Sequence, residues 1–233
     1  MKHVTIILAF LMTLSSPLAA QDPQKGLTAY QADDYATAFQ EWTPLAEAGD
    51  AFSQALLGTM YYKGEGVPQD YVEAMKWFRL AADQGYASAQ SDLGDMYLMG
   101  RGVPQDSAEA VKWYRLAADQ GKASTQYNLG YMYANGDGVP PDYAEAVKWF
   151  RLAADQGDTN AQVYLGVMYE YGTGVLQDNV MAHMWYNIGA ANGNELGGTN
   201  RDSIAEGMTQ QSIEQAQAMA RECMSSGYKN CGG

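Results

Sequence analysis

The chain has 233 residues, with 27 acidic and 14 basic side chains, and its formal net charge is −13 at pH 7. An acidic chain repels nucleic-acid phosphates and anionic membrane surfaces, so neither is expected as a partner, whereas a basic partner would be attracted. The same charge also serves the solubility of a largely exposed surface.

Residues 1–20 have the pattern of a secretory signal peptide. Lys2 and His3 precede the apolar run VTIILAFLMTL, and the small residues of SSPLAA follow it, so we expect cleavage near Ala20. No cysteine follows the run, which argues against a lipid anchor, and no later stretch approaches about 18 uninterrupted apolar residues. The sequence predicts a bacterial-type exported protein, periplasmic or secreted, without membrane insertion once the signal is removed.

Residues 21–49 are expected to form a degenerate N-terminal cap. Asp34 and Gly49 lie 36 residues before Asp70 and Gly85, which have the same roles in the next segment, but a long Gly-Val-Pro loop is missing here. This segment is therefore interpreted as a shortened copy of the unit that follows.

Residues 50–193 repeat one unit four times with a period of 36 residues. Two of the positions that keep this step are occupied by Gly58, Gly94, Gly130 and Gly166, and by Trp77, Trp113, Trp149 and Trp185. A fixed period of this length is typical of a solenoid, in which each unit needs neighbours to bury its apolar faces. We place the units at 50–85, 86–121, 122–157 and 158–193.

Each unit is predicted to contain two helices joined by a loop. In the second unit, the first helix has an apolar stripe at three- and four-residue steps, formed by Ala89, Leu93, Met96 and Tyr97. Gly100 is suited to a left-handed residue that ends this helix, and Pro104 prevents the helix from resuming.

The second helix of that unit is predicted to begin at the N-cap Asp106, with Glu109 completing a capping box. Arg115 and Asp119 lie four residues apart and are expected to pair on the solvent side, as are Arg79 with Asp83 and Arg151 with Asp155. In the fourth unit Asp178 is followed by Met181, so half of the capping box is missing.

Residues 194–233 are expected to form C-terminal capping helices and a tail. The stretch NGNELGGTN is interpreted as the loop where the repeat ends, and Thr209 as the N-cap of a closing helix. Cys223 and Cys231 are a candidate disulfide, which would stabilise the tail by ~2.5 kcal/mol through loop closure. The alternative is two free thiols, one of them reactive.

The pattern LG-x-x-Y-x-x-G-x-GV-x-x-D-x-x-x-A-x-x-W-x-x-x-AA-x-x-G resembles the Sel-one-like repeat, a relative of the tetratricopeptide repeat. Residues 93–94, 97, 100, 102–103, 106, 110, 113, 117–118 and 121 supply every position of it. The resemblance covers residues 50–193, and 24–49 in degenerate form. It implies an all-α fold, a right-handed α-solenoid of helix-turn-helix repeats, with first helices lining a concave face and with an adaptor role.

The resemblance supplies no catalytic residue, and we predict no enzymatic activity, cofactor or metal site. His183 is the one histidine after the signal segment and replaces apolar core residues of the earlier units, so we interpret it as a packed side chain. A cysteine-rich branch of the family has been connected with β-lactam binding and hydrolysis, but its cysteine pairs are missing here.

The first helices vary where the second helices are almost copied. Two neighbouring positions hold Leu56, Asp92, Asn128 and Tyr164, and Thr59, Asp95, Tyr131 and Val167. If the first helices line a groove, this face meets a ligand; drift between duplicated copies is the alternative. The candidate partner-binding residues, whose tyrosines are expected to be exposed, are Asp92, Asp95, Tyr127, Asn128, Tyr131, Tyr164 and Val167.

We therefore predict an exported scaffold that binds a protein or peptide, favoured to be basic by Asp92 and Asp95. Two alternatives stay open: a cell-envelope hydrolase acting on a β-lactam or cell-wall fragment, and a structural spacer that self-associates through the solenoid ends. The partner and the oligomeric state are not determined by the sequence.

Overall fold

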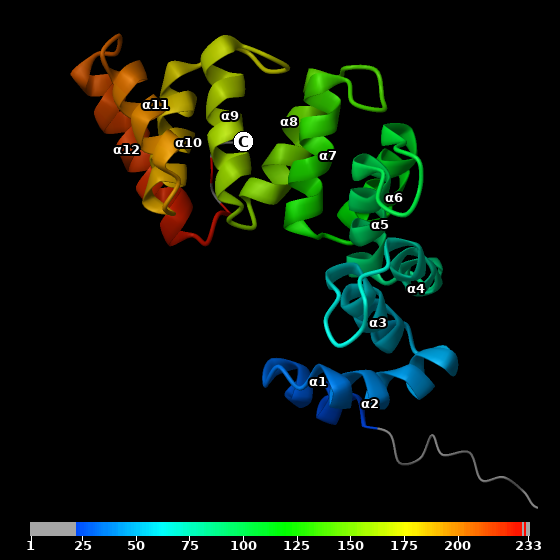
Figure 1. Cartoon of the computed structure of the whole chain (residues 1–233). Helices are drawn as coiled ribbons and strands as arrows, with labels where there is room; N and C mark the ends of the chain where they lie inside the picture. The colour runs from blue at the N-terminus through cyan, green and yellow to red at the C-terminus, as the bar shows by residue number, and fades with distance from the viewer. Residues whose placement is uncertain (1–21, 230, 232–233) are drawn as a thin grey trace, which may run out of the picture.

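Pairs of antiparallel helices stack one after another into a curved row in the computed structural model of the chain, which describes residues 22–229 and 231 (Figure 1). The predicted signal peptide, residues 1–20, lies outside this range. Within it there are helices and no strands, so the predicted all-α solenoid is confirmed. The helices are α1 Pro23–Gln31, α2 Tyr35–Glu47, α3 Ala51–Lys63, α4 Tyr71–Asp83, α5 Ala87–Met99, α6 Ser107–Asp119, α7 Ala123–Asn135, α8 Tyr143–Ala154, α9 Thr159–Tyr171, α10 Asn179–Ala191, α11 Glu195–Ala205 and α12 Gln210–Ser225.

The two helices of each unit pack through a glycine. The aromatic rings of Phe78, Tyr114, Phe150 and Tyr186 on the second helices lie against Gly58, Gly94, Gly130 and Gly166 on the first helices. A Cβ atom at Gly94 would lie only 2.4 Å from Cδ1 of Tyr114. The glycine step found in the sequence therefore marks the close approach of two helices, which a larger residue would prevent.

Buried glutamines join one unit to the next. Gln90 Nε2 donates to the carbonyl oxygen of Ala82 in the preceding helix at 3.2 Å, and Gln90 Oε1 accepts from Gln120 Nε2 at 2.7 Å. Gln54, Gln126 and Gln162 form equivalent bonds at the same 36-residue step. Because a buried amide needs its partners, this ladder fixes the register between units.

The predicted N-caps are confirmed, but the capping boxes close only in part. Asp106 Oδ1 accepts from the backbone N–H of Glu109 at 3.0 Å, and the N–H of Asp106 itself donates to the carbonyl of Tyr97 at 2.9 Å. Because the N–H of Asp106 already has a partner, the Glu109 carboxylate does not bond to it and pairs instead with Lys112 Nζ at 2.7 Å. Glu73 and Glu145 pair in the same way with Lys76 and Lys148.

The predicted pairing of Arg79 with Asp83 is wrong. The guanidinium of Arg79 lies 4.6 Å from the ring centroid of Trp113 in the next unit and donates to Tyr97 Oη at 2.6 Å. Arg115 likewise lies over the ring of Tyr133. The face of a buried ring such as that of Trp113 attracts a guanidinium more than an exposed carboxylate on the same helix does, because water weakens the exposed ion pair.

The repeat does not end at the predicted loop. Helix α11 begins at Glu195, 36 residues after Thr159 begins α9, and it packs on α10 as a further first helix. The loop interpretation of residues 192–200 is therefore wrong from Glu195 onward. Gly197 lies within α11 and allows this helix to approach α10 closely: a Cβ there would lie 2.8 Å from the backbone nitrogen of Ala190.

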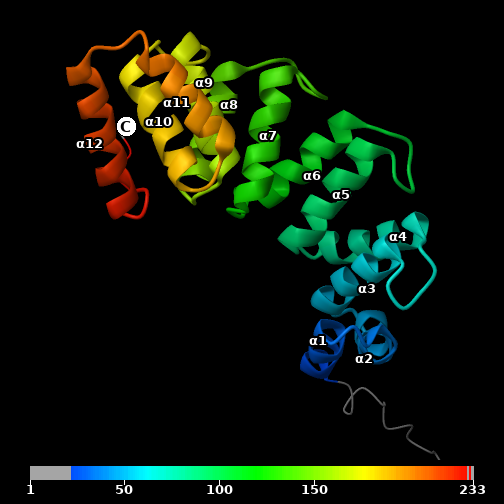
Figure 2. The ribbon, with the colours of Figure 1, turned by 60° about the vertical axis from the view of Figure 1, so that its left-hand side comes forward.

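Helix α12 closes the stack at its C-terminal end by packing on α10 (Figure 2). Its N-cap is Thr209, as predicted, with Thr209 Oγ1 accepting from the N–H of Ser212 at 3.2 Å. Cys223 and Cys231 form a disulfide, and the carbonyl of Cys231 accepts from Arg151 Nη1 at 3.2 Å. The tail is thereby bound back onto the neighbouring helix α8.

Candidate binding face

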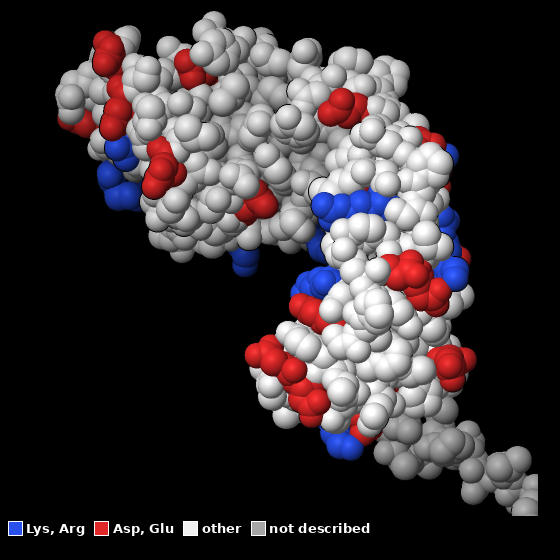
Figure 3. All heavy atoms as spheres, viewed as in Figure 1, with Lys and Arg blue, Asp and Glu red and all other residues white. Residues whose placement is uncertain are grey.

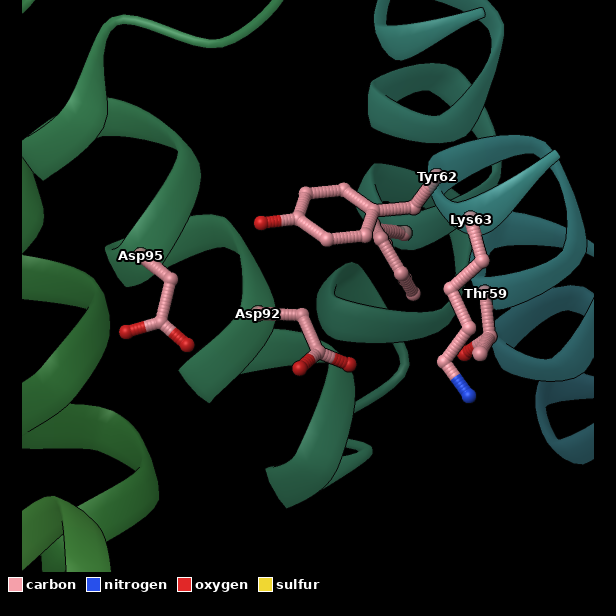
Figure 4. A pocket seen from close by; sticks show the side chains of 6 residues that line it. Thr59, Tyr62, Lys63, Asp92 and Asp95 are labelled. Carbon is pink, nitrogen blue, oxygen red and sulfur yellow. The ribbon is translucent and has the colours of Figure 1, made fainter. Parts of the chain in front are cut away.

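Successive first helices enclose a row of pockets on the surface that we call the first-helix face. The pocket between α3 and α5 has a volume of about 150 Å³ (Figure 4). Asp92 and Asp95 line it from the α5 side, and three α3 side chains form the opposite wall. With Phe78 of α4 included, its lining residues are Thr59, Tyr62, Lys63, Phe78, Asp92 and Asp95.

The pocket between α5 and α7 has a volume of about 220 Å³ and uses the same six positions, each 36 residues later. These are Asp95, Leu98, Met99, Tyr114, Asn128 and Tyr131, to which Met132 and Asp137 are added. Asp95 thus lies between the two pockets and lines both.

The pocket between α9 and α11 repeats the arrangement in about 170 Å³. It is lined by Val167, Glu170, Tyr171, Tyr186, Asn200 and Ser203. Because Asn200 and Ser203 of α11 stand 36 residues after Tyr164 and Val167, α11 continues the first-helix face as well as the fold.

Aromatic rings occupy the corresponding space between α7 and α9. Tyr164 stacks on Phe150 with ring centroids 5.2 Å apart, and Tyr131 meets Tyr164 edge-on at 6.0 Å. Tyr127 packs against Phe150 and Tyr164 at 5.8 Å. This cluster, called the tyrosine cluster below, lies at the position that corresponds to the three pockets of the α3/α5, α5/α7 and α9/α11 intervals.

The predicted site residues fall in four neighbouring places along this face. Asp92 and Asp95 line the first pocket, Asn128 and Tyr131 the second, Tyr127 and Tyr164 the tyrosine cluster, and Val167 the last pocket. The expected exposure holds for Tyr131, which is 41% exposed, but is wrong for Tyr127 and Tyr164. Those two rings are half-buried because they pack on each other and on Phe150.

Two further positions of the first helices line the pockets although they were not among the candidate residues. Tyr62, Leu98 and Glu170 occupy a third first-helix position that also varies from unit to unit, and Met99 follows Leu98. The comparison of the repeats therefore marks the position of Tyr62, Leu98 and Glu170 in the sequence, whereas Met99 was not expected. The pocket residues Phe78, Tyr114 and Tyr186 come from the second helices, where no candidate residue was expected.

Burial governs the charges in the first two pockets. It raises the pKa of Asp92 to about 6; the nearby charge of Lys122 opposes this rise and that of Asp95 adds to it. The Tyr114 hydroxyl donates to Asp95, and burial together with that carboxylate raises the pKa of Tyr114. Tyr186 donates to Glu170 in the same way at 2.6 Å.

Basic groups lie at the edge of the first pocket but are already engaged. Lys63 Nζ donates to Tyr30 Oη at 3.1 Å and pairs with Glu65 at 3.6 Å. Arg101 donates to the Tyr62 hydroxyl and lies over its ring. In the view of Figure 3, acidic and basic side chains are interspersed, and uncharged atoms cover most of the surface.

The described residues offer little support for catalysis at this face. His183 is 2% exposed within α10, where burial lowers its pKa, and it lines none of the three pockets. Within residues 22–229 and 231, no cluster of histidine, cysteine, aspartate and glutamate could hold a metal ion. No helix in the same range is both long enough and apolar enough to cross a membrane.

A family model, the Sel1 repeat, matches the chain at residues 51–86, 87–122, 123–158 and 159–194. A Sel1 repeat protein from Oxalobacter formigenes has a similar crystal structure, with 33% identity, coverage of 88% of this chain and 78% of that one, and a TM-score of 0.72. No curated protein matches the chain significantly.

A second similar structure is c5321, described as a protective antigen present in uropathogenic Escherichia coli strains and displaying an SLR fold. It is 36% identical over 91% of this chain, with a TM-score of 0.79. The match spans 46% of c5321, so this chain corresponds to about half the length of that relative.

Proposed function

Since the chain belongs to the Sel1 repeat family, whose repeats generally mediate contacts between proteins, we propose that it is an exported scaffold that binds a segment of a partner protein on its first-helix face. The row of pockets supports this proposal. Helices that only form a core need no repeated pockets between them, whereas a ligand-binding surface needs pockets to hold the ligand.

The contrast between the two kinds of helix points to the same face. The second helices α4, α6 and α8 share the near-identical sequences KWFRLAADQG and KWYRLAADQG, whereas the pocket-lining positions change from unit to unit. Each pocket therefore presents different side chains on the same helical framework. Such a surface is suited to recognise the sequence of a bound segment, with Tyr131 offering contact area at low entropic cost.

Export is supported by two independent features of the chain. The signal-like pattern of residues 1–20 directs a protein out of the cytoplasm, and the Cys223–Cys231 disulfide is suited to an oxidising compartment. We expect the mature protein to begin near Gln21 and to be found in the periplasm or medium. N-terminal sequencing of the chain recovered from those fractions measures this.

Site-specific photo-cross-linking tests the location of binding. A photo-reactive amino acid replaces Tyr131 on the first-helix face or, as a matched control, Leu116 on the second helix α6; these side chains are 41% and 47% exposed. We expect irradiation in an envelope extract to give a partner adduct from position 131 alone. Equal adducts at both positions, or none at position 131, would contradict the proposal.

The hydrolase alternative receives no support from the position of His183, the one histidine among the described residues. Because that side chain is buried in α10 and outside the three pockets, it is not available to a substrate at the first-helix face.

A further inference from the structure

We propose that the bound segment is an extended peptide that places a basic side chain in the α3/α5 pocket and a large apolar side chain in the α5/α7 pocket. This inference rests on the proposed function and adds the chemistry of the ligand. It follows from the lining of the two pockets, from the residue that the two pockets share, and from the tyrosine cluster in the next interval.

The α3/α5 pocket has the chemistry of a cation site with an aromatic wall. No described residue donates a hydrogen bond to the Asp92 carboxylate, and Asp95 accepts from Tyr114. Figure 4 shows the Tyr62 ring reaching into the space between the two α3 and α5 walls. An arginine or lysine could pair with both carboxylates while its stem packs on Tyr62 and Phe78.

The cations already present do not fulfil this role. Lys63 is held by Tyr30 and Glu65 on its own side, and Arg101 is held by the hydroxyl and ring of Tyr62. The nearby charge of Lys122 offsets the charge of Asp92 in part, but no described residue forms an ion pair with this half-buried carboxylate. A basic side chain from a ligand would supply that partner, and an acidic one would be repelled.

The α5/α7 pocket differs because apolar side chains dominate it. Leu98 and Met132 form part of its wall, and Met99 and Tyr131 stay 54% and 41% exposed at its edge. The hydroxyl of its floor residue, Tyr114, is already bonded to Asp95. A leucine, methionine or phenylalanine of the ligand would bury these surfaces, and methionine and tyrosine adapt readily to such a side chain.

The two anchors flank one shared residue, because Asp95 lines both pockets. An extended chain rises about 3.3 Å per residue. The two anchoring side chains should therefore stand only a few residues apart, in either chain direction. Beyond the second pocket the peptide would cross the packed rings of the tyrosine cluster.

Selection from a library of random dodecapeptides displayed on phage tests this inference. The intact chain is compared with Asp92→Asn and with a matched control, Asp119→Asn, an exposed carboxylate at the end of α6 outside the three pockets. We expect the intact chain and the control to enrich peptides with Arg or Lys a few residues from Leu, Met or Phe. Asp92→Asn should lose the basic preference but keep the apolar one.

The affinity of a selected peptide then measures how much its basic residue contributes to binding. Replacing its basic residue by citrulline should weaken binding to the intact chain at least tenfold, and should change binding to Asp92→Asn much less. Enrichment of acidic or purely apolar peptides, or no enrichment, would overturn the inference. A cross-link at position 131 alongside either result would leave the proposed function standing, so the two failures are distinguishable.

Discussion

At the scale of single residues, the charge of Asp92 destabilises the fold, and in the proposed site it would bind a basic side chain. Its carboxyl group is half-buried and receives no hydrogen bond from a described residue, so burial raises its pKa to about 6. Lys122 opposes this rise, while Asp95 adds to it, and Lys63 and Arg101 are engaged elsewhere. Above that pH the folded chain carries an incompletely compensated charge.

Replacing this charge should make the protein more stable near neutral pH. The pKa of Asp92 is higher in the folded than in the unfolded chain, so its ionisation lowers the free energy of unfolding as pH rises from about 4 to about 6. Urea unfolding should show Asp92→Asn more stable by about 1 to 2 kcal/mol at pH 7 and equal to the parent below pH 4. A constant difference at both pH values would contradict this assignment.

The glycine step gives a second prediction at this scale. In Gly94→Ala the new Cβ would meet the Tyr114 ring, 2.4 Å away, so the two helices must separate and the free energy of unfolding should fall by about 1–3 kcal/mol. The control is Gly198→Ala in α11, where the nearest neighbour of the Cβ would be 3.9 Å away. Helix propensity should stabilise that variant slightly; equal effects of both substitutions in urea unfolding would exclude the packing argument.

At the scale of helices, α10 differs from the other second helices because α12 covers it. Met181 and Met184 stand where α8 has Glu145 and Lys148, and they are 8% and 0% exposed. Ile188 is fully buried, whereas Leu152, its equivalent in α8, is 46% exposed. The missing half of the capping box at Met181 therefore has a packing cause: a glutamate–lysine pair would be buried under α12.

Placing on α10 the lysine that α4, α6 and α8 carry at this position should undock α12. In Met184→Lys an ammonium group would enter the apolar contact with α12, and we expect a loss of about 2–4 kcal/mol. The matched substitution Lys148→Met lies on the exposed face of α8 and should change the free energy of unfolding by less than about 0.5 kcal/mol. Hydrogen exchange should show faster exchange in α12 of the first variant; unchanged exchange there would contradict the docking role.

At the scale of the whole molecule, contacts run between neighbouring helices along the stack, as in other repeat arrays. A local change should therefore have local consequences. Reduction of Cys223–Cys231 should lower the stability of the C-terminal end by ~2.5 kcal/mol through the lost loop constraint. Hydrogen exchange should rise in α12 and remain unchanged in α3 to α6, with the oxidised chain as control; a uniform rise would mean that the array unfolds as one unit.

The sequence by itself determined the features that depend on local chemistry or on the period. Aspartate N-caps, glycine helix ends and the 36-residue step follow from positions near each other in the chain, and they specify the solenoid and the first-helix positions that vary. The period even extends to α11, although the glycines of residues 197 and 198 concealed it.

Only the tertiary structure decided which partner each side chain takes. Arg79 contacts the ring of Trp113 instead of pairing with Asp83. Tyr127 and Tyr164 pack together instead of being exposed, and Tyr114 on the second helix donates a hydrogen bond to Asp95. These contacts join residues 19 to 37 positions apart, where water exclusion and close packing outweigh neighbouring charges. The pockets of the first-helix face are a product of that packing, so their shape and depth could not be derived from the order of the residues.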